Sequence, residues 1–165
     1  MNDILKECNL CPRNCRINRY KQLGACGANE KLKIAYYSLH LWEEPIISGK
    51  NGSGTIFFSN CNLKCIYCQN RKISTGGYGK EIDSNKLKEI MLSLQNDNAH
   101  NINLVTPTHY VPQILEVLKE IKNKDYCACI ANKSCVDEYG LTLLDENIQD
   151  NNLFFDAYTC KYICF

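Results

Sequence analysis

Apolar positions along the chain fall into short continuous runs and longer helical repeats. Residues 55–58 form a short apolar run of the kind that fills a buried strand, and residues 102–105 form another. Between them, apolar side chains recur with the 3.6-residue period of a helix that begins at Asp83 or Ser84 and runs to about residue 96. The recurring positions are Leu87, Ile90, Met91 and Leu94. The pattern therefore predicts a strand, a helix and a strand in succession.

The same alternation continues further along the chain. A second amphipathic helix is expected over residues 112–124, and residues 126–131 are a candidate third strand. The apolar face of this helix consists of Ile114, Leu115, Leu118 and Ile121. Residues 32–42 alternate loosely and indicate a strand or an extended arm. Alternating strands and helices imply an α/β fold with parallel strands and right-handed crossovers.

Two of the predicted strands are followed by residues that can carry chemistry. Three cysteines follow residues 55–58, and the sequence Thr-Pro-Thr-His, residues 106–109, follows residues 102–105. Ligands of parallel α/β folds gather at the carboxyl ends of strands, so both loops are expected at one site. His109 has two candidate roles, which are a contact with cofactor or substrate and a hydrogen bond that satisfies a loop carbonyl.

The spacing of Cys61, Cys65 and Cys68 allows three thiolates to converge on one point. Structural zinc usually takes four protein ligands, whereas a cubane iron–sulfur cluster held by three leaves one iron open to a small molecule. Such an iron can bind and polarise a substrate as well as pass electrons. The alternatives are a zinc site that borrows a fourth ligand and three buried thiols without a metal.

Four more cysteines precede the predicted core: Cys8, Cys11, Cys15 and Cys26. Pro12, Gly24 and Gly27 break regular structure here, so residues 8–26 are expected to form a compact N-terminal knuckle. Four thiolates suit a zinc ion or a second, closed cluster, and free thiols on a flexible arm are the alternative. Three arginines in the knuckle would either lower the thiolate pKa values or form a solvated face: Arg13, Arg16 and Arg19.

Composition limits the partners and the cellular compartment that can be expected for the chain. The 165 residues carry a formal net charge of +1, which gives no bulk electrostatic reason to expect nucleic acid or a membrane surface as a partner. No apolar stretch of about 18 residues is present, and the first residues lack the apolar core of a signal peptide. Twelve cysteines at short spacings then favour metal binding in a reducing cytoplasm over disulfides.

Longer motifs carry a family resemblance over about residues 8–121. They are Cys-Asn-Leu-Cys-Pro-Arg-Asn-Cys from residue 8, His-Leu-Trp-Glu-Glu-Pro-Ile-Ile-Ser-Gly from residue 40, Gly-Ser-Gly-Thr-Ile-Phe-Phe-Ser-Asn-Cys-Asn-Leu-Lys-Cys-Ile-Tyr-Cys-Gln-Asn from residue 52, and Asn-Ile-Asn-Leu-Val-Thr-Pro-Thr-His-Tyr-Val-Pro from residue 101. Together they resemble the radical S-adenosylmethionine proteins that are similar to pyruvate formate-lyase activating enzyme.

The resemblance implies a fold, cofactors and partners. The expected fold is an incomplete (β/α)6 partial barrel, and the expected cofactors are a [4Fe–4S] cluster on Cys61, Cys65 and Cys68 and S-adenosylmethionine on the open iron. Tyr67 is expected near the adenine, and backbone carbonyls near Thr106 are the candidates for a contact with the cofactor's amino group. His109, in the same motif, is a further candidate for cofactor binding. A reductant such as flavodoxin or ferredoxin would supply the electron that yields methionine and a 5′-deoxyadenosyl radical. A glycyl radical enzyme is the candidate partner, and a different substrate for the same chemistry is the runner-up.

Length sets the remaining expectations. We divide the chain into a cysteine-rich N-terminal extension, residues 1–50, and a radical S-adenosylmethionine core, residues 51–165. The resemblance ends near residue 124, the family is about twice as long, and the cysteines from residue 127 onward have no metal-binding spacing. We therefore expect a truncated or divergent chain that accepts a cluster, turns S-adenosylmethionine over slowly, and associates through an exposed third strand. The other candidates are a non-catalytic iron–sulfur or zinc protein and an inactive fragment.

Overall fold

One mixed sheet organises the computed structural model, which describes residues 3–43, 48–121, 127–130 and 161–164. Among these residues the strand order is β3-β1-β2-β4-β5-β6. The strands are β1 (Leu32–His40), β2 (Ser53–Phe58), β3 (Lys80–Ile82), β4 (Ile102–Val105), β5 (Cys127–Ile130) and β6 (Lys161–Cys164).

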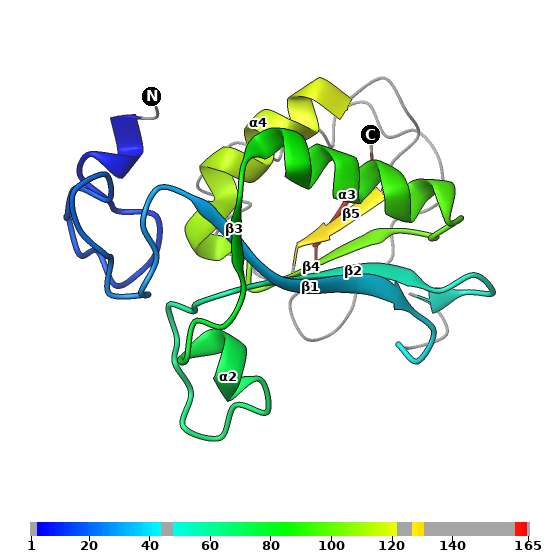
Figure 1. Cartoon of the computed structure of the whole chain (residues 1–165), viewed down its shortest axis with the longest axis horizontal. Helices are drawn as coiled ribbons and strands as arrows, with labels where there is room; N and C mark the ends of the chain where they lie inside the picture. The colour runs from blue at the N-terminus through cyan, green and yellow to red at the C-terminus, as the bar shows by residue number, and fades with distance from the viewer. Residues whose placement is uncertain (1–2, 44–47, 122–126, 131–160, 165) are drawn as a thin grey trace.

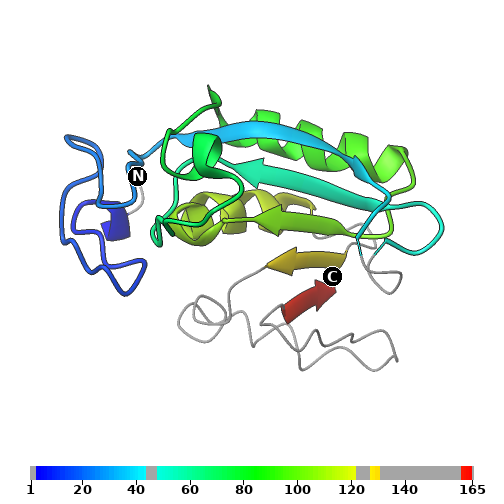
Figure 2. The same cartoon turned by 90° about the horizontal axis from the view of Figure 1, so that it is seen from below.

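The centre of the sheet has the predicted parallel arrangement. β2 pairs in parallel with β4, and β4 pairs in parallel with β5. Helix α3 (Ser84–Asn96) connects β2 to β4 after β3, and helix α4 (Val111–Ile121) follows β4. Both helices lie on the same side of the sheet and pack against each other (Figure 1). The parallel strands therefore end together at one edge of the sheet (Figure 2).

Local signals explain where the helices begin. The side chain of Asp83 accepts a hydrogen bond of 2.7 Å from the backbone N–H of Lys86 and caps α3. Pro112 stands in the first turn of α4, where its missing N–H has no intrahelical partner to lose. Shorter turns are α2 (Arg71–Ser74) and 3-10 turns at Asp3–Leu5 and Thr108–Tyr110.

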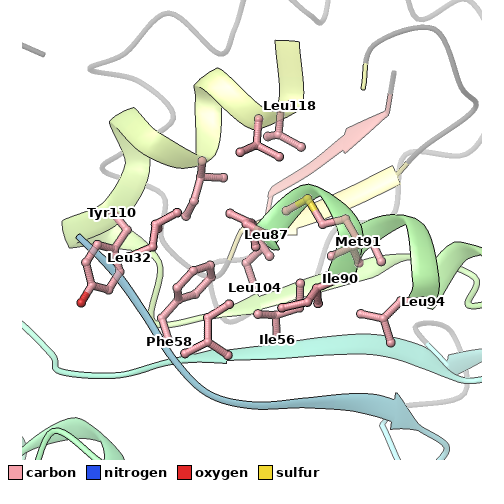
Figure 3. Packing of buried hydrophobic residues seen from close by; sticks show 14 of the residues in the cluster. Leu32, Ile56, Phe58, Leu87, Ile90, Met91, Leu94, Leu104, Tyr110 and Leu118 are labelled. Atoms are coloured by element: carbon pink, nitrogen blue, oxygen red, sulfur yellow. The ribbon is translucent and has the colours of Figure 1, made fainter. Parts of the chain in front are cut away.

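The hydrophobic core lies between the two long helices and the sheet (Figure 3). All four predicted apolar positions of α3 are buried there, and they meet Ile56 and Phe58 of β2 and Leu104 of β4. Because alternate residues of a strand point to opposite faces, β2 and β4 give this core every second side chain. The periodicity in the sequence thus predicts the face of each element that is buried.

Three features differ from the sequence-based expectation. β1 lies within the predicted extension, residues 1–50, yet it pairs antiparallel with β2 and is part of the sheet. The short elements α2 and β3, on either side of Gly76, Gly77 and Gly79, are not among the predicted elements. β5 is not an exposed edge, because β6 pairs with it antiparallel, so the expectation of an open third strand is wrong. Association of the chain stays a prediction.

Several expectations reach beyond the described residues. Residues 122–124 of the predicted second helix, positions 126 and 131 of the third strand, Cys135 and Cys160 lie outside them. The partial barrel and the division at residue 50 stay predictions. None of the helices in the described ranges has the length and apolar character that crossing a bilayer requires.

Candidate metal centre

The three cysteines of the central motif lie on a loop directly after β2. This cluster loop, residues 61–68, is at the edge to which β2 and β4 point (Figure 2). Asn60 starts the loop with φ of +70°, and its backbone N–H donates to the carbonyl of Ile73 at 3.0 Å. Lys64 also has a positive φ, +53°, and the N–H of Cys68 donates to the carbonyl of Cys65 at 3.3 Å. These turns fold all three cysteines into one short segment.

The donor set fits an iron–sulfur cluster. All three thiols are free and partly exposed. The Cys61 Sγ accepts a hydrogen bond from the N–H of Leu63, and the Cys68 Sγ accepts one from the Ser74 hydroxyl, each at 3.4 Å. Such donors stabilise negative charge on sulfur and tune bound clusters. Within the described residues no three His, Cys, Asp or Glu side chains are grouped closely enough to hold a metal, so the thiols must turn toward a common centre on binding.

The loop after β4 lies against the cluster loop, as the shared strand edge predicts. The His109 Nε2 donates to the carbonyl of Ser59 at 2.9 Å, and the Asn60 side-chain amide donates to the Tyr110 hydroxyl at 3.3 Å. Both histidine and tyrosine side chains are buried. The two loops therefore meet through a buried polar contact at the ends of neighbouring parallel strands.

Burial controls the protonation of these two side chains. Desolvation lowers the pKa of His109 from 6.5 to about 4, although its hydrogen bond to Ser59 acts in the opposite direction. Desolvation also raises the pKa of Tyr110 to about 12. Both groups are neutral near pH 7. Of the two candidate roles for His109, the geometry contains the hydrogen bond to a loop carbonyl; its assignment to the cofactor stays a prediction.

The two other predicted cofactor residues differ in exposure. The Tyr67 side chain is 87% exposed, at the outer side of the cluster loop. Thr106 is half-buried and has φ of +60°. A β-branched residue rarely adopts this left-handed conformation, and such strain concentrates at functional sites. The structure thus places both residues at the same edge as the cysteines, while their contacts with a cofactor stay predictions.

The N-terminal knuckle carries its four cysteines beside this edge (Figures 1 and 2). Cys8 and Cys26 are buried, whereas Cys11 and Cys15 are partly exposed. Burial raises the pKa of the Cys26 thiol, although the Arg19 guanidinium favours its thiolate form. Burial opposes ionisation of Cys15 as well, but hydrogen bonds from the backbone at Ala25 and Ile17 leave the pKa of that thiol lowered.

Two arginines have roles that the sequence does not reveal. Arg13 donates from Nε to the carbonyl of Asn62 at 2.8 Å and from Nη2 to the carbonyl of Leu63 at 3.2 Å. Arg19 is fully buried and donates from Nη1 to the carbonyl of His109 at 2.5 Å. The partners are about 50 and 90 positions away, so no local pattern could have indicated them. A cysteine-rich segment with three arginines was the only available signal.

Comparison with known proteins supplies the family. The chain is 35% identical over 134 residues to an uncharacterized protein of Methanocaldococcus jannaschii, and the match covers 74% of the chain. It covers 37% of that relative, so the chain spans well under half of the relative's length. No solved structure matches the chain. The family described as "4Fe-4S single cluster domain" matches residues 47–153, which include β2, the cluster loop and the loop after β4. A strand edge that presents three thiols and this match lead to one conclusion: the chain belongs to the 4Fe-4S single cluster domain family.

Proposed function

We propose that the chain binds a [4Fe–4S] cluster through Cys61, Cys65 and Cys68 and uses it to cleave S-adenosylmethionine reductively. The observation that carries the proposal is a set of three, rather than four, thiols on one short loop at the carboxyl end of a parallel strand. Three protein ligands leave a cubane with one iron for a small molecule. When bound, the cluster would supply that iron to the amino and carboxylate groups of S-adenosylmethionine, and an electron that splits the sulfonium into methionine and a 5′-deoxyadenosyl radical.

Residues at the ends of β2 and β4 lie where they could bind and orient S-adenosylmethionine. The β2 and β4 loops meet at the strand edge where parallel α/β proteins bind ligands. The strained backbone at Thr106 lies in the second of these loops, which makes its peptide groups the candidates for a contact with the cofactor's amino group. The exposed ring of Tyr67 is available to cover the adenine. These residues would bind and orient S-adenosylmethionine, and excluding water there would protect the radical.

The neutral, buried His109 contributes by position. Its Nε2–H holds the Ser59 carbonyl, two residues before Cys61. The ring therefore fixes the start of the cluster loop relative to the loop after β4. We assign it a positioning role, because its 1% exposure keeps it from reaching a ligand in solvent.

The test is product formation from S-adenosylmethionine. The chain is reconstituted anaerobically with iron and sulfide, reduced with dithionite or with reduced flavodoxin, and mixed with S-adenosylmethionine. We expect 5′-deoxyadenosine and methionine in equal amounts, and none from a Cys65→Ala variant treated in the same way. A chain with an intact, reducible cluster and no 5′-deoxyadenosine above the variant's background would instead be a non-catalytic iron–sulfur protein. A glycyl radical enzyme is the first macromolecular substrate to test, since the resemblance is to activating enzymes.

A further inference from the structure

The N-terminal knuckle is too small to hold its shape by apolar packing alone. Its own buried cluster consists of Leu5, Cys8 and Leu10, with three partly buried side chains packed around it. The only regular element described there is the 3-10 turn at Asp3–Leu5. Segments of this size usually need a disulfide or a metal to remain folded. All four cysteines are free thiols, so no disulfide stabilises the knuckle, and a bound metal ion is the remaining way to cross-link it.

Three of the four cysteines lie close together in the structure. The point that a Cβ on Gly24 would occupy lies 3.2 Å from the Cys26 Sγ and 3.9 Å from the Cys15 Sγ. The Cys15 Sγ also lies 3.9 Å from the carbonyl oxygen of Cys8. As at the cluster loop, the present side-chain positions do not yet form a metal-binding geometry within the described residues. Metal binding would require these thiols, and that of Cys11, four residues before Cys15, to turn toward a common centre.

The backbone of the knuckle explains how the thiols come together. The N–H of Cys8 donates to the carbonyl of Ile17 at 2.9 Å, and the N–H of Arg16 donates back to the carbonyl of Cys8 at 2.8 Å. Asn14 and Arg16 adopt positive φ values of 41° and 52°, which tighten the turn between these two hydrogen bonds. This fixed turn brings Cys15 next to Cys8.

A single ion fits this arrangement better than a second cubane. With Zn–S bonds of about 2.3 Å, two sulfur ligands of a tetrahedral zinc lie roughly 3.8 Å apart. The ligands of a cubane bind different irons and therefore stand further apart, so a single ion suits a segment as short as residues 8–26 better. Four protein ligands also close the coordination sphere, as in structural zinc sites.

The buried charge of Arg19 also supports a zinc site in the knuckle. Arg19 is buried and donates only to backbone carbonyls, those of Asn29 and His109, and no carboxylate of the described residues pairs with it. A buried cation without a counter-charge is costly. Zinc replaces the protons of four thiols, which pass to solvent, and the resulting site carries two net negative charges.

The knuckle is also joined to the cluster loop. The Cys26 carbonyl accepts a hydrogen bond of 3.4 Å from the N–H of Cys61, the first predicted cluster ligand. Arg13, which lies between Cys11 and Cys15 in sequence, holds the next two carbonyls of the loop, at Asn62 and Leu63. Cys26 packs in the main core, whereas Cys8 packs in the knuckle's own cluster, so a shared ion would tie the two together.

We propose that the four thiols of the N-terminal knuckle hold one structural zinc ion, and that this zinc site steadies the cluster loop through Arg13. The inference rests on the part of the proposed function that places the cluster on Cys61, Cys65 and Cys68, and on no step of S-adenosylmethionine cleavage. The zinc site thereby slows loss of iron from the neighbouring loop.

The metal content of a variant chain tests whether the knuckle binds zinc. The full chain is produced with Cys61, Cys65 and Cys68 all changed to Ser, in medium that supplies both zinc and iron. We expect about one zinc per chain and no iron, and Co²⁺ in place of zinc should give the absorption of a tetrahedral four-thiolate site. Adding Cys15→Ser should remove the zinc and this spectrum. Iron and sulfide in the triple variant, or no metal at all, would overturn the assignment.

The rate of iron loss from the cluster tests whether the zinc site stabilises the cluster loop through Arg13. With the cluster ligands intact, Arg13→Gln is compared with Arg16→Gln, a neighbouring exposed arginine that has no hydrogen bond to the cluster loop. We expect Arg13→Gln to keep its zinc and to lose iron to a chelator several-fold faster than wild type, while Arg16→Gln behaves as wild type. Stripping zinc from the wild-type chain should accelerate iron loss similarly, and adding zinc back should reverse it. Equal rates of iron loss in wild type, Arg13→Gln and the zinc-stripped chain would overturn the coupling, whether or not S-adenosylmethionine is cleaved.

Discussion

The residues behind the cluster loop form a polar network in an otherwise apolar place. His109 reaches the Ser59 carbonyl, Arg19 reaches the His109 carbonyl, and Tyr110 receives a hydrogen bond from Asn60. Each of these side chains is at least nine-tenths buried. Buried polar groups are costly unless they are paired, so the network specifies one arrangement of the loops around it.

This network makes stability depend on pH through His109. Its folded pKa, about 4, is below its ordinary value of 6.5, so the unfolded chain binds a proton more readily in between. The stabilisation is therefore complete above pH 6.5 and is lost as the pH falls toward 4. We expect the free energy of unfolding in urea to fall by about 2 kcal/mol between pH 7 and pH 5 because of this residue.

A His109→Gln variant provides the control for that dependence. Glutamine retains an amide donor for the Ser59 carbonyl but does not titrate in this range. The variant should lose markedly less stability than wild type over the same pH interval. Identical pH profiles for the two proteins would show that His109 is not the titrating group.

The three cluster cysteines carry a second residue-scale prediction. Replacing Cys61, Cys65 or Cys68 singly by Ala should abolish the visible absorbance of the cluster and its electron paramagnetic resonance signal on reduction, because three ligands leave no redundancy. Arg16→Gln is the control, because it removes neither a thiol nor a contact with the cluster loop. A full cubane signal in all three loop variants would refute the ligand assignment.

Residue chemistry was predictable only where the ligands are close in sequence. The spacing of the three cysteines indicates a metal loop, and the family match agrees with a cluster. Arg13, Arg19 and Asn60 act through partners far away in the sequence, so their roles depend on the tertiary fold. For His109 the sequence offered two roles; the folded chain contains the hydrogen bond to a loop carbonyl, and a contact with the cofactor stays a prediction.

At the scale of elements, a single cap defines the start of α3. The Asp83 side chain satisfies the Lys86 N–H, one of the donors that a helix start leaves unpaired. Asp83→Ala should lower the free energy of unfolding by about 1 kcal/mol. Asp97, the residue at the other end of the same helix, is the control, because the helix dipole does not stabilise a negative charge at the C-terminus of a helix.

Urea unfolding of both variants measures this difference. Asp83→Ala should shift the midpoint downward, whereas Asp97→Ala should leave it unchanged or raise it slightly. Equal losses in the two variants would mean that general surface effects, and not the cap, account for the result.

Periodicity succeeded for the elements that bury one face and failed for those set by their neighbours. α3, α4, β2 and β4 each have an apolar stripe or run that points to the core, and each lies where the sequence predicts it. β3 has three residues, none of them fully buried, and exists because it pairs with β1. β6 likewise depends on pairing with β5. Such strands have no strong pattern of their own.

At the scale of the whole molecule, the sheet places two cysteine-bearing segments at one edge. The parallel strands deliver the cluster loop there, and the N-terminal knuckle packs beside it through Arg13 and the Cys26 carbonyl (Figure 2). This arrangement differs from a simple division at residue 50, because β1 joins the sheet and the knuckle contacts the loop. The knuckle and the core are therefore expected to act as one unit in cluster binding.

The most direct test of the account concerns the open iron. The chain is reconstituted anaerobically and reduced, and the electron paramagnetic resonance spectrum of its cluster is recorded before and after addition of S-adenosylmethionine. Methionine, which has the same amino and carboxylate groups, and adenosine, which lacks them, serve as reference ligands. We expect that S-adenosylmethionine changes the spectrum, that ¹⁷O in its carboxylate broadens the signal, and that adenosine does neither. A reduced [4Fe–4S] signal that S-adenosylmethionine leaves unchanged at saturating concentration would contradict the claim that three thiols leave one iron for it.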